Sequence, residues 1–307
     1  MHVLLTGASG FVGSYVLAKL LEDGHQVAVL LRPQSNRWRI KPLLEKCVVM
    51  EQNLESIHLV QEAVTAFAPE ALIHTAWYGV THDQRNNPDQ INRNLILLNH
   101  LFYVAQTAGV KTIIGFGSQA EYGPVNRIIN EQQPTHPTTL YGVAKLAAYH
   151  LLDVLCAQHN IRFVWHRLFS AYGPKDAPSW FIPFLIRKLM NHEEPELTAG
   201  TQLWDFIFVE DVAQAVMDTL NSQASGIFNL GSGKAYPIKT IAELIANYIN
   251  PQISLGFGKM SFRQDQVMHL EADISRLNKQ VGWRPKMSLT EGLKQTMDWY
   301  KNESSSQ

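Results

Sequence analysis

The order of apolar runs along the chain limits the fold more than any other feature. Short runs rich in branched side chains alternate with longer stretches in which apolar residues recur at helical spacing. The runs are His2–Thr6, Gln26–Leu31, Cys47–Glu51, Ala71–Thr75, Lys111–Gly117 and Ile161–Arg167, and the helical stretches include Phe11–Asp23, Ser56–Phe67, Pro88–Ala108 and Thr139–His159. Strands that alternate with helices require right-handed crossovers, which produce a parallel sheet covered on both faces. The sequence therefore predicts an α/β fold built on a doubly wound parallel sheet.

The regular alternation ends after Tyr172, where four prolines follow at positions 174, 178, 183 and 195. The segments "DFIFV" (205–209) and "GIFNLGSG" (226–233) are predicted to return to the sheet. We therefore expect a first domain made of residues 1–172 and 203–233. A smaller α/β domain is expected from 173–202 and 234–302, and residues 303–307 are expected to form a flexible tail.

Composition excludes several classes of function. The 307 residues are 46% hydrophobic, enough for a large core, and the net charge of −1 gives no broad attraction to nucleic acid or to an anionic membrane. Cys47 and Cys156 are too few for a disulfide framework, and the twelve histidines lack metal-ligand spacing, so no metal is predicted. No signal-peptide pattern or apolar run of about 18 residues is present, so we expect a cytoplasmic protein.

The first loop carries three glycines, Gly7, Gly10 and Gly13, between a strand and a helix. Such a loop lets backbone amides at a helix N-terminus approach a pyrophosphate, which a side chain would block. The same spacing also occurs in plain tight turns. Its place in a strand–helix–strand unit favours a dinucleotide site.

The end of the second strand bears on which dinucleotide is bound. An acidic residue there bonds the adenosine ribose of NAD, whereas an arginine accommodates the 2′-phosphate of NADP. This chain has Leu31 and then Arg32, with Arg37 and Arg39 close behind. We predict a preference for NADP(H), with NAD(H) possible if Arg32 is only a solvated loop residue.

A second motif places Tyr141 and Lys145 four residues apart, on one face of a predicted helix. A phenol needs help to act as an acid or base near neutral pH, and an ammonium group stabilises its phenolate. Ser118 ends a predicted strand 23 residues earlier. Its hydroxyl would orient a carbonyl at the ligand-binding edge of the sheet, although it could also serve as a simple cap.

Several segments together resemble the extended short-chain dehydrogenase/reductase family of NAD(P)-dependent nucleotide-sugar epimerases, dehydratases and reductases. They are "TGASGFVG", "GSQAEYG", Tyr141-x-x-x-Lys145, "RLFSAYGP", "WDFIFVEDVAQAV", "FNLGSG" and "VGWRP" (281–285). The resemblance runs from residue 1 to about 300. It implies a Rossmann-type sheet with a smaller α/β substrate-binding domain, and a homodimer formed through the two long helices.

The resemblance also implies roles for individual residues. Ser118, Tyr141 and Lys145 match the catalytic residues. The cofactor would be contacted by the glycine loop and by later strand ends: Gly7, Ser9, Gly10, Phe11, Val12, Gly13, Arg32, Asn53, Leu54, Ala76, Tyr141 and Lys145. The nucleotide-diphosphate sugar would be contacted by Trp77, Ser118, Ser170, Trp180, Trp204 and Arg263. Core packing is an equal alternative for the tryptophans and for Tyr78.

Three departures from the family pattern narrow the expected reaction. Family dehydratases have an acid where this chain has Ala120, and Glu121 is expected on the opposite face, so a 4,6-dehydratase is not expected. The usual arginine before "DF" is Trp204 and the usual asparagine of the "YGP" motif is Ser170, so either another cation holds the substrate phosphates or the substrate differs. The available cations are Arg187, Lys188 and Arg263.

The NADP prediction and the segments "GSQAEYG" and "QLWDF" favour a 4-ketoreductase of deoxysugar biosynthesis. It would reduce a nucleotide-linked 4-keto-6-deoxy sugar with NADPH, with Tyr141 as the proton donor. The alternative is a nucleotide-sugar 4-epimerase with tightly bound NAD. A non-catalytic NADP-sensing regulator is a third interpretation, against which the Tyr141–Lys145 pair weighs.

Overall fold

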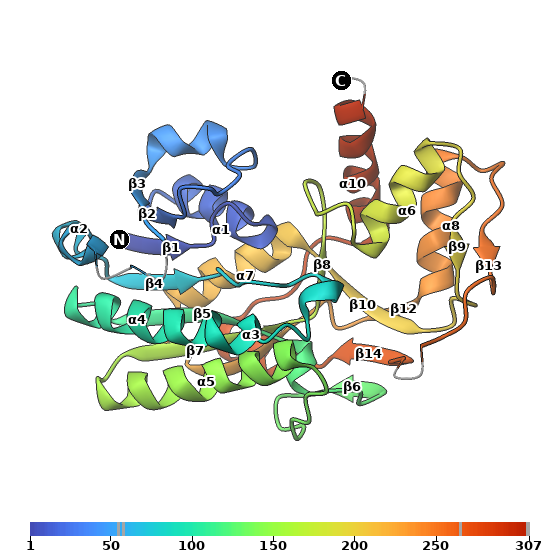
Figure 1. Ribbon diagram of the computed structural model, residues 1–307. Coiled ribbons are helices and arrows are strands. Elements are labelled where there is room, and N and C mark those ends of the chain that lie inside the picture. The colour runs from blue at the N-terminus through green and yellow to red at the C-terminus, as the bar shows by residue number, and fades with distance from the viewer. Residues whose placement is uncertain (54–55, 57–58, 264–265, 305–307) are drawn as a thin grey trace.

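The largest element of the computed structural model is a seven-stranded sheet in the order β11-β7-β5-β4-β1-β2-β3 (Figure 1). The model describes all residues except 54–55, 57–58, 264–265 and 305–307. All neighbouring strands are parallel. They are β1 (His2–Thr6), β2 (Gln26–Leu31), β3 (Val48–Glu51), β4 (Ala71–His74), β5 (Thr112–Ser118), β7 (Arg162–Leu168) and β11 (Gly226–Leu230). The predicted doubly wound, Rossmann-type α/β fold is confirmed.

Helices cover both faces of this sheet, which explains why its strands are apolar without alternation. Side chains of successive residues point to opposite faces, so Val3 and Leu5 pack into one core cluster and Leu4 into the other. On one face lie α1 (Phe11–Glu22), α7 (Val209–Asn221) and α9 (Ser275–Val281). On the other lie α2 (Gln61–Phe67), α4 (Asn94–Thr107) and α5 (Leu140–Gln158).

Two of the helices need comment: one predicted helix is divided in two, and another is unusually long and apolar. The predicted helix over 88–108 is interrupted at Arg93, which separates α3 (Asp89–Asn92) from α4. Within the described part of the chain, α5 alone is long and apolar enough to cross a membrane by length and composition. It packs against α4, β5 and β7, as a core helix does.

A second lobe lies at the carboxyl ends of the large sheet, on the right in Figure 1. Its sheet has the order β12-β10-β14-β6, with β8 paired to β10. These strands are β6 (Arg127–Ile129), β8 (Ser170–Tyr172), β10 (Leu203–Phe208), β12 (Ala235–Pro237) and β14 (His269–Ala272). The lobe also contains α6 (Phe181–Met190), α8 (Ile238–Ile249), α10 (Leu289–Ser304) and the strand pair β9 (Glu196–Leu197) and β13 (Gly256–Phe257).

The predicted return of residues 205–209 to the large sheet is wrong for β10. The buried Asp205 carboxylate instead accepts hydrogen bonds from the backbone amides of Ser232, Gly233 and Ala272, which holds β10 beside β14. An apolar pattern indicates a strand but not its partner. We propose the domain division predicted above with residues 203–208 moved to the smaller domain. The predicted tail over 303–307 is wrong at its start, because α10 extends to Ser304, and residues 305–307 lie outside the described residues.

Candidate functional site

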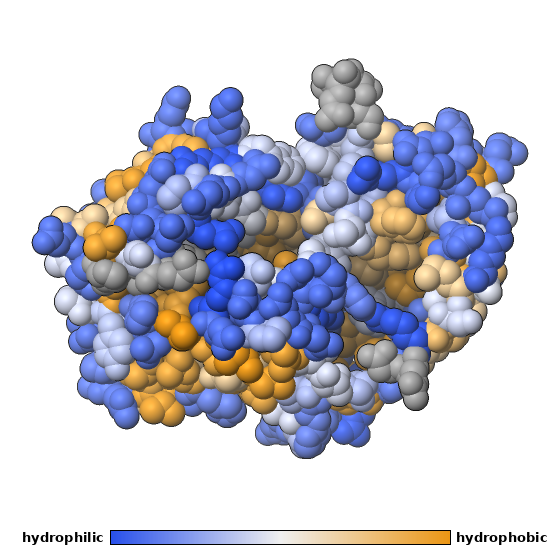
Figure 2. Space-filling model, in the orientation of Figure 1, coloured by the Kyte–Doolittle hydropathy of each residue, from blue (hydrophilic) through white to orange (hydrophobic). Residues whose placement is uncertain are grey.

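One cleft of about 1330 Å³ lies between the carboxyl ends of the large sheet and the second lobe. Figure 2 shows the surface hollowed between the two lobes. The glycine loop lines one end of the cleft, Tyr141 and Lys145 its middle, and Trp180, Trp204 and other residues of the second lobe the rest. The fold thus brings together residues more than 250 positions apart.

The glycine loop has no room for side chains. A Cβ atom on Gly13 would lie 2.1 Å from the Gly7 carbonyl oxygen, and one on Gly7 would lie 2.5 Å from the Ala76 amide nitrogen. Gly7 also has a φ of 77°, which glycine adopts without strain. Gly10 is the N-cap of α1, which has no side-chain cap and no acidic residue in its first turn. These residues therefore fit a dinucleotide pyrophosphate at the helix N-terminus.

Two of the residues predicted to contact the adenosine part of the cofactor lie at the surface of the cleft. Arg32 and Asn53 line the cleft with Ser9, Phe11 and Val12, and Arg32 is exposed. Arg37 is instead paired with Glu51 at 2.7 Å, and Arg39 donates to the backbone carbonyl of Lys175. The predicted residue Leu54 lies outside the described residues.

The three candidate catalytic residues converge in the cleft. Ser118 ends β5, and Tyr141 and Lys145 project from the first turns of α5. Burial raises the pKa of the Tyr141 phenol, while a hydrogen bond with Ser118 and the Arg85 guanidinium act to lower it. Helix α5 is placed by the side chain of Thr139, which caps Gly142.

The Lys145 ammonium group contacts other groups more closely than it contacts the Tyr141 phenol. Its Nζ donates to the Phe116 carbonyl at 2.7 Å and lies 3.7 Å from the Trp77 ring centroid, against 5.9 Å for the Tyr141 ring. Burial lowers the pKa of Lys145 to about 7. Trp77, predicted as a substrate contact, lines the cleft but also covers this ammonium group.

Glu121 lies in a short 3-10 helix, η4 (Gln119–Glu121), and not on the strand that the sequence suggested. Its side chain is fully buried and does not line the cleft. It accepts from the Ser118 amide at 2.8 Å, the Trp165 indole at 3.1 Å and Arg167 Nε at 2.7 Å. The Glu121 carboxylate is therefore used by these three donors, and its distance from a bound substrate stays a prediction.

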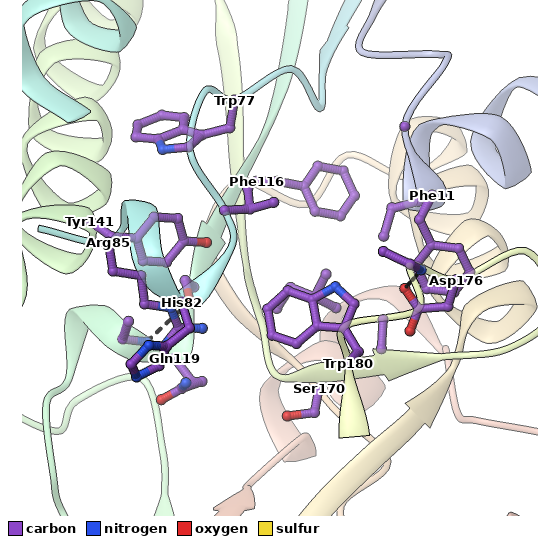
Figure 3. A pocket seen from close by; sticks show the side chains of 18 of the residues that line it. Phe11, Trp77, His82, Arg85, Phe116, Gln119, Tyr141, Ser170, Asp176 and Trp180 are labelled. Atoms are coloured by element: carbon purple, nitrogen blue, oxygen red, sulfur yellow. Dashed lines mark hydrogen bonds between the residues drawn. The ribbon is translucent and has the colours of Figure 1, made fainter. Parts of the chain in front are cut away.

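On the substrate side, the two residues that depart from the family pattern bond to each other. The Trp204 indole donates to the Ser170 hydroxyl at 2.7 Å, and both line the cleft. Figure 3 shows Trp180 on the wall opposite Tyr141. Of the three candidate cations, Arg263 lines the cleft and contacts His82, whereas Lys188 pairs with Glu193.

The segment between β4 and α3 contains site residues that sequence reasoning missed. Its Arg85 lies beside the Tyr141 ring (Figure 3), with its guanidinium carbon 5.5 Å from the ring centroid. The segment is held by buried Gln90 and Asn94, which bond the Trp77 indole and the Tyr78 backbone. Arg85 lies in a polar loop with no periodicity, so no sequence signal marked it, and Gln90 and Asn94 lie in α3 and α4 as polar residues that periodicity does not single out.

The model of the NAD dependent epimerase/dehydratase family matches residues 3–231. The chain belongs to this family. It is 26% identical to a putative UDP-glucose 4-epimerase of Methanocaldococcus jannaschii, over 98% of each chain. It is 27% identical to a dTDP-6-deoxy-L-talose 4-dehydrogenase (NAD(+)) of Aggregatibacter actinomycetemcomitans, over 81% of this chain and 91% of the other.

Among solved structures, MoeE5 in complex with UDP-glucuronic acid and NAD superposes with a TM-score of 0.84. It is 26% identical and covers 99% of this chain and 100% of its own. The chain is therefore a nucleotide-sugar enzyme of the epimerase/dehydratase type, related to proteins that bind NAD and UDP-sugars.

Proposed function

We propose that the protein is a nucleotide-sugar 4-epimerase that keeps NAD bound and acts on a UDP-sugar. One observation carries this proposal: a single cleft joins the glycine loop, Ser118, Tyr141 and Lys145 to the second lobe. The similarity to a putative UDP-glucose 4-epimerase and to MoeE5 with its UDP-sugar and NAD supports it. This replaces the 4-ketoreductase as the main interpretation.

In the proposed mechanism Tyr141 holds and moves the proton at the C4 hydroxyl of the sugar. Ser118 orients the C4 oxygen, and Lys145 adds positive charge when it is protonated. The nicotinamide cofactor, held by Gly7, Gly10, Gly13 and neighbouring residues, would supply the hydride acceptor and donor when bound. Epimerisation also requires the ring to turn within the cleft so that the opposite face is presented.

Arg263 is the proposed contact to the substrate diphosphate, because it is a cleft-lining arginine of the second lobe. The proposed roles of Ser170, Trp180 and Trp204 are in shaping the sugar and nucleotide pocket. Trp204 uses its indole N–H on Ser170, so its contribution to a ligand would be its ring face.

The second candidate function is a 4-ketoreductase, which two observations favour. Arg32 is exposed at the adenosine end of the cleft, where it could meet a 2′-phosphate. The relative from Aggregatibacter actinomycetemcomitans is named as a 6-deoxysugar 4-dehydrogenase. In that reaction the Tyr141 phenol would give its proton to the keto oxygen and NADPH would be consumed.

The deciding experiment begins with the purified protein. Released cofactor is identified by mass spectrometry, and the protein is then incubated with UDP-glucose, UDP-glucuronic acid and UDP-N-acetylglucosamine. An epimerase yields the 4-epimer without net change of cofactor. Oxidation of NADPH by 4-keto-6-deoxy sugars instead would select the ketoreductase, and no turnover of either kind would favour a regulator.

Two variants sharpen the result. Tyr141→Phe should lower turnover by about 10²- to 10⁴-fold while cofactor binding persists. Arg32→Leu should weaken NADP binding by about tenfold or more and leave NAD binding unchanged if Arg32 faces a 2′-phosphate. Equal effects on both cofactors would contradict the role assigned to Arg32.

We also propose that the chain forms a homodimer through α4 and α5 and works in the cytoplasm. Apolar side chains are exposed on both helices, namely Ile96 and Tyr103 on α4 and Val143 and Val154 on α5. Figure 2 shows hydrophobic surface along this side of the molecule. Light scattering of the purified protein tests the dimer, and Val154→Glu should yield a monomer.

A further inference from the structure

The lysine of the Tyr141–Lys145 pair does not supply a constant charge at the phenol. Its Nζ is bonded to the Phe116 carbonyl and covered by the Trp77 ring. With its pKa lowered to about 7 by burial, Lys145 is partly neutral near neutral pH. A tyrosine that must pass through its phenolate form needs positive charge that persists across that range.

Arg85 has the geometry to supply that charge. Its guanidinium carbon lies 5.5 Å from the Tyr141 ring centroid, and its backbone carbonyl accepts the Tyr141 amide hydrogen at 2.8 Å. The neighbouring Asn86 side chain accepts from the Leu140 amide at 3.1 Å. The turn that carries Arg85 is thus bonded to the first residues of α5, so the guanidinium and the phenol are fixed relative to each other.

The Arg85 guanidinium is not committed to another anion within the described residues. Its Nε is buried and has no hydrogen-bond partner there, and no carboxylate pairs with its side chain among them. An arginine that only stabilises a turn usually donates hydrogen bonds to carbonyl or carboxylate oxygens. The Arg85 guanidinium has no such partner and lies beside the Tyr141 phenol, an arrangement that favours an electrostatic effect on the ionisation of that phenol.

We propose that Arg85 is a positioning residue for Tyr141 that stabilises its phenolate form, and so shares the task that the family motif assigns to Lys145. The effect of Arg85 on catalysis rests on the proposed function, whereas its effect on the ionisation of Tyr141 does not. An arginine stays charged at every pH at which the fold survives, so this stabilisation does not depend on the state of Lys145.

The groups that face the Tyr141 phenol come from several elements. Ser118 and Glu121 lie at the end of β5 and in η4, Lys145 on α5, and Arg85 on the turn after η3 (His82–Gln84). Glu121 opposes ionisation of the phenol, while Ser118 and Arg85 favour it. Removing Arg85 takes away one of the two groups that favour ionisation and leaves the opposing effect of Glu121, so the phenol should ionise at higher pH.

The test is a direct titration of Tyr141 that needs no substrate. Tyrosines are replaced by 3-fluorotyrosine, which ionises at lower pH, and the fluorine resonance of Tyr141 is assigned by its loss in Tyr141→Phe. The pH dependence of its chemical shift is then measured in the wild type, Arg85→Met, Arg85→Gln and Arg85→Lys. Arg127→Gln is the matched control, since Arg127 is exposed, bonds Gln133 and lies away from the cleft.

Loss of a unit charge 5.5 Å from the Tyr141 ring centroid should raise the Tyr141 titration midpoint by about one to two pH units in Arg85→Met and Arg85→Gln. Arg85→Lys should restore at least half of that shift, and Arg127→Gln should move it by less than about 0.2 units. An unchanged midpoint in both neutral variants, or an equal shift in Arg127→Gln, would overturn the proposal. Thermal melting shows whether each variant is folded. If only one of Arg85→Met and Arg85→Gln folds, its titration alone decides the test.

Activity provides a second readout. The rate at which added sugar nucleotide reduces the bound cofactor should rise with pH, and its midpoint should move upward in Arg85→Gln by the shift seen in the titration. If no sugar is turned over, the proposed function fails while the titration still decides the role of Arg85. If turnover is normal and the titration does not shift, Arg85 has no such role and the proposed function stands.

Discussion

The buried carboxylate of Glu121 allows a quantitative test of how Ser118 is held. Glu121 is fully buried and accepts hydrogen bonds from the Ser118 amide, the Trp165 indole and Arg167 Nε. The Arg167 side chain is itself only 3% exposed. Glu121→Ala removes the acceptor for three buried donors at once and leaves a guanidinium without its counter-ion.

Removing one partner of a buried ion pair costs about 3 to 5 kcal/mol in the free energy of unfolding. For a chain of this size each 1 kcal/mol corresponds to about 2 °C, so Tm should fall by about 6 to 10 °C. Glu121→Gln keeps an oxygen for Ser118 and Trp165 but brings an amide donor to Arg167, and should cost about 2 to 3 kcal/mol. Glu121→Val with Arg167→Met removes both charges and should recover most of the loss.

The assay is thermal unfolding of the four proteins, with Glu194→Gln as the control. Glu194 pairs with Lys259 at 2.8 Å, but their side chains are 40% and 49% exposed, so its loss should cost at most about 1 kcal/mol. Turnover should fall more in Glu121→Ala than in Glu121→Gln, because the Ser118 amide loses its anchor only in the former. A Tm of Glu121→Ala within about 2 °C of wild type would refute the reasoning, as would a double variant less stable than Glu121→Ala.

Three further predictions concern other buried groups. Gly13→Ala should abolish detectable NAD binding in calorimetry, because its Cβ would lie 2.1 Å from the Gly7 carbonyl oxygen. The pKa of Lys145 is lowered from 10.5 to about 7, so its neutral form favours folding. The free energy of unfolding in urea should therefore rise between about pH 7 and pH 10.5, by up to about 5 kcal/mol, and Lys145→Met should lack that rise. Burial lowers the pKa of His166 to about 3, so stability from its neutral form is lost as pH falls below about 6.5, by about 2 kcal/mol at pH 5. His166→Phe, which fits between the rings of Phe116 and Phe228, should lack this loss in the same assay.

The large sheet could be predicted because each of its strands is apolar on both faces and lies between helical stretches. Strands β1 and β2 begin and end where the pattern placed them, and the others differ by a residue or so. The second lobe could not be predicted in the same way. Its strands have two to six residues, and β10 carries a buried Asp205 whose amide partners lie far away in the sequence. Which strand β10 pairs with is set by these long-range contacts, and local periodicity in the sequence carries no information about them.

The candidate site was predictable where a motif fixes the chemistry. Ser118, Tyr141 and Lys145 were found from their spacing and from strand and helix ends, and the structure places all three in one cleft. The surroundings that set their charges were not predictable. Arg85 belongs to a polar loop, and the contact of Lys145 with Trp77 depends on how that loop folds back over α5.

The positions at which this chain departs from the family pattern are bonded to other residues and are not isolated. Trp204 and Ser170, which replace an arginine and an asparagine, are joined by a hydrogen bond at 2.7 Å. Glu121, in place of an apolar residue, fits because Gly117 leaves the space that its carboxylate and the Trp165 indole occupy; a Cβ on Gly117 would lie 2.3 Å from Glu121 Oε1. Restoring the family residue at one such position would therefore leave its partner unsatisfied. Trp204→Arg should be tolerated better together with Ser170→Asn than alone, and a purely additive effect of the two changes on stability would show that the pair is not coupled.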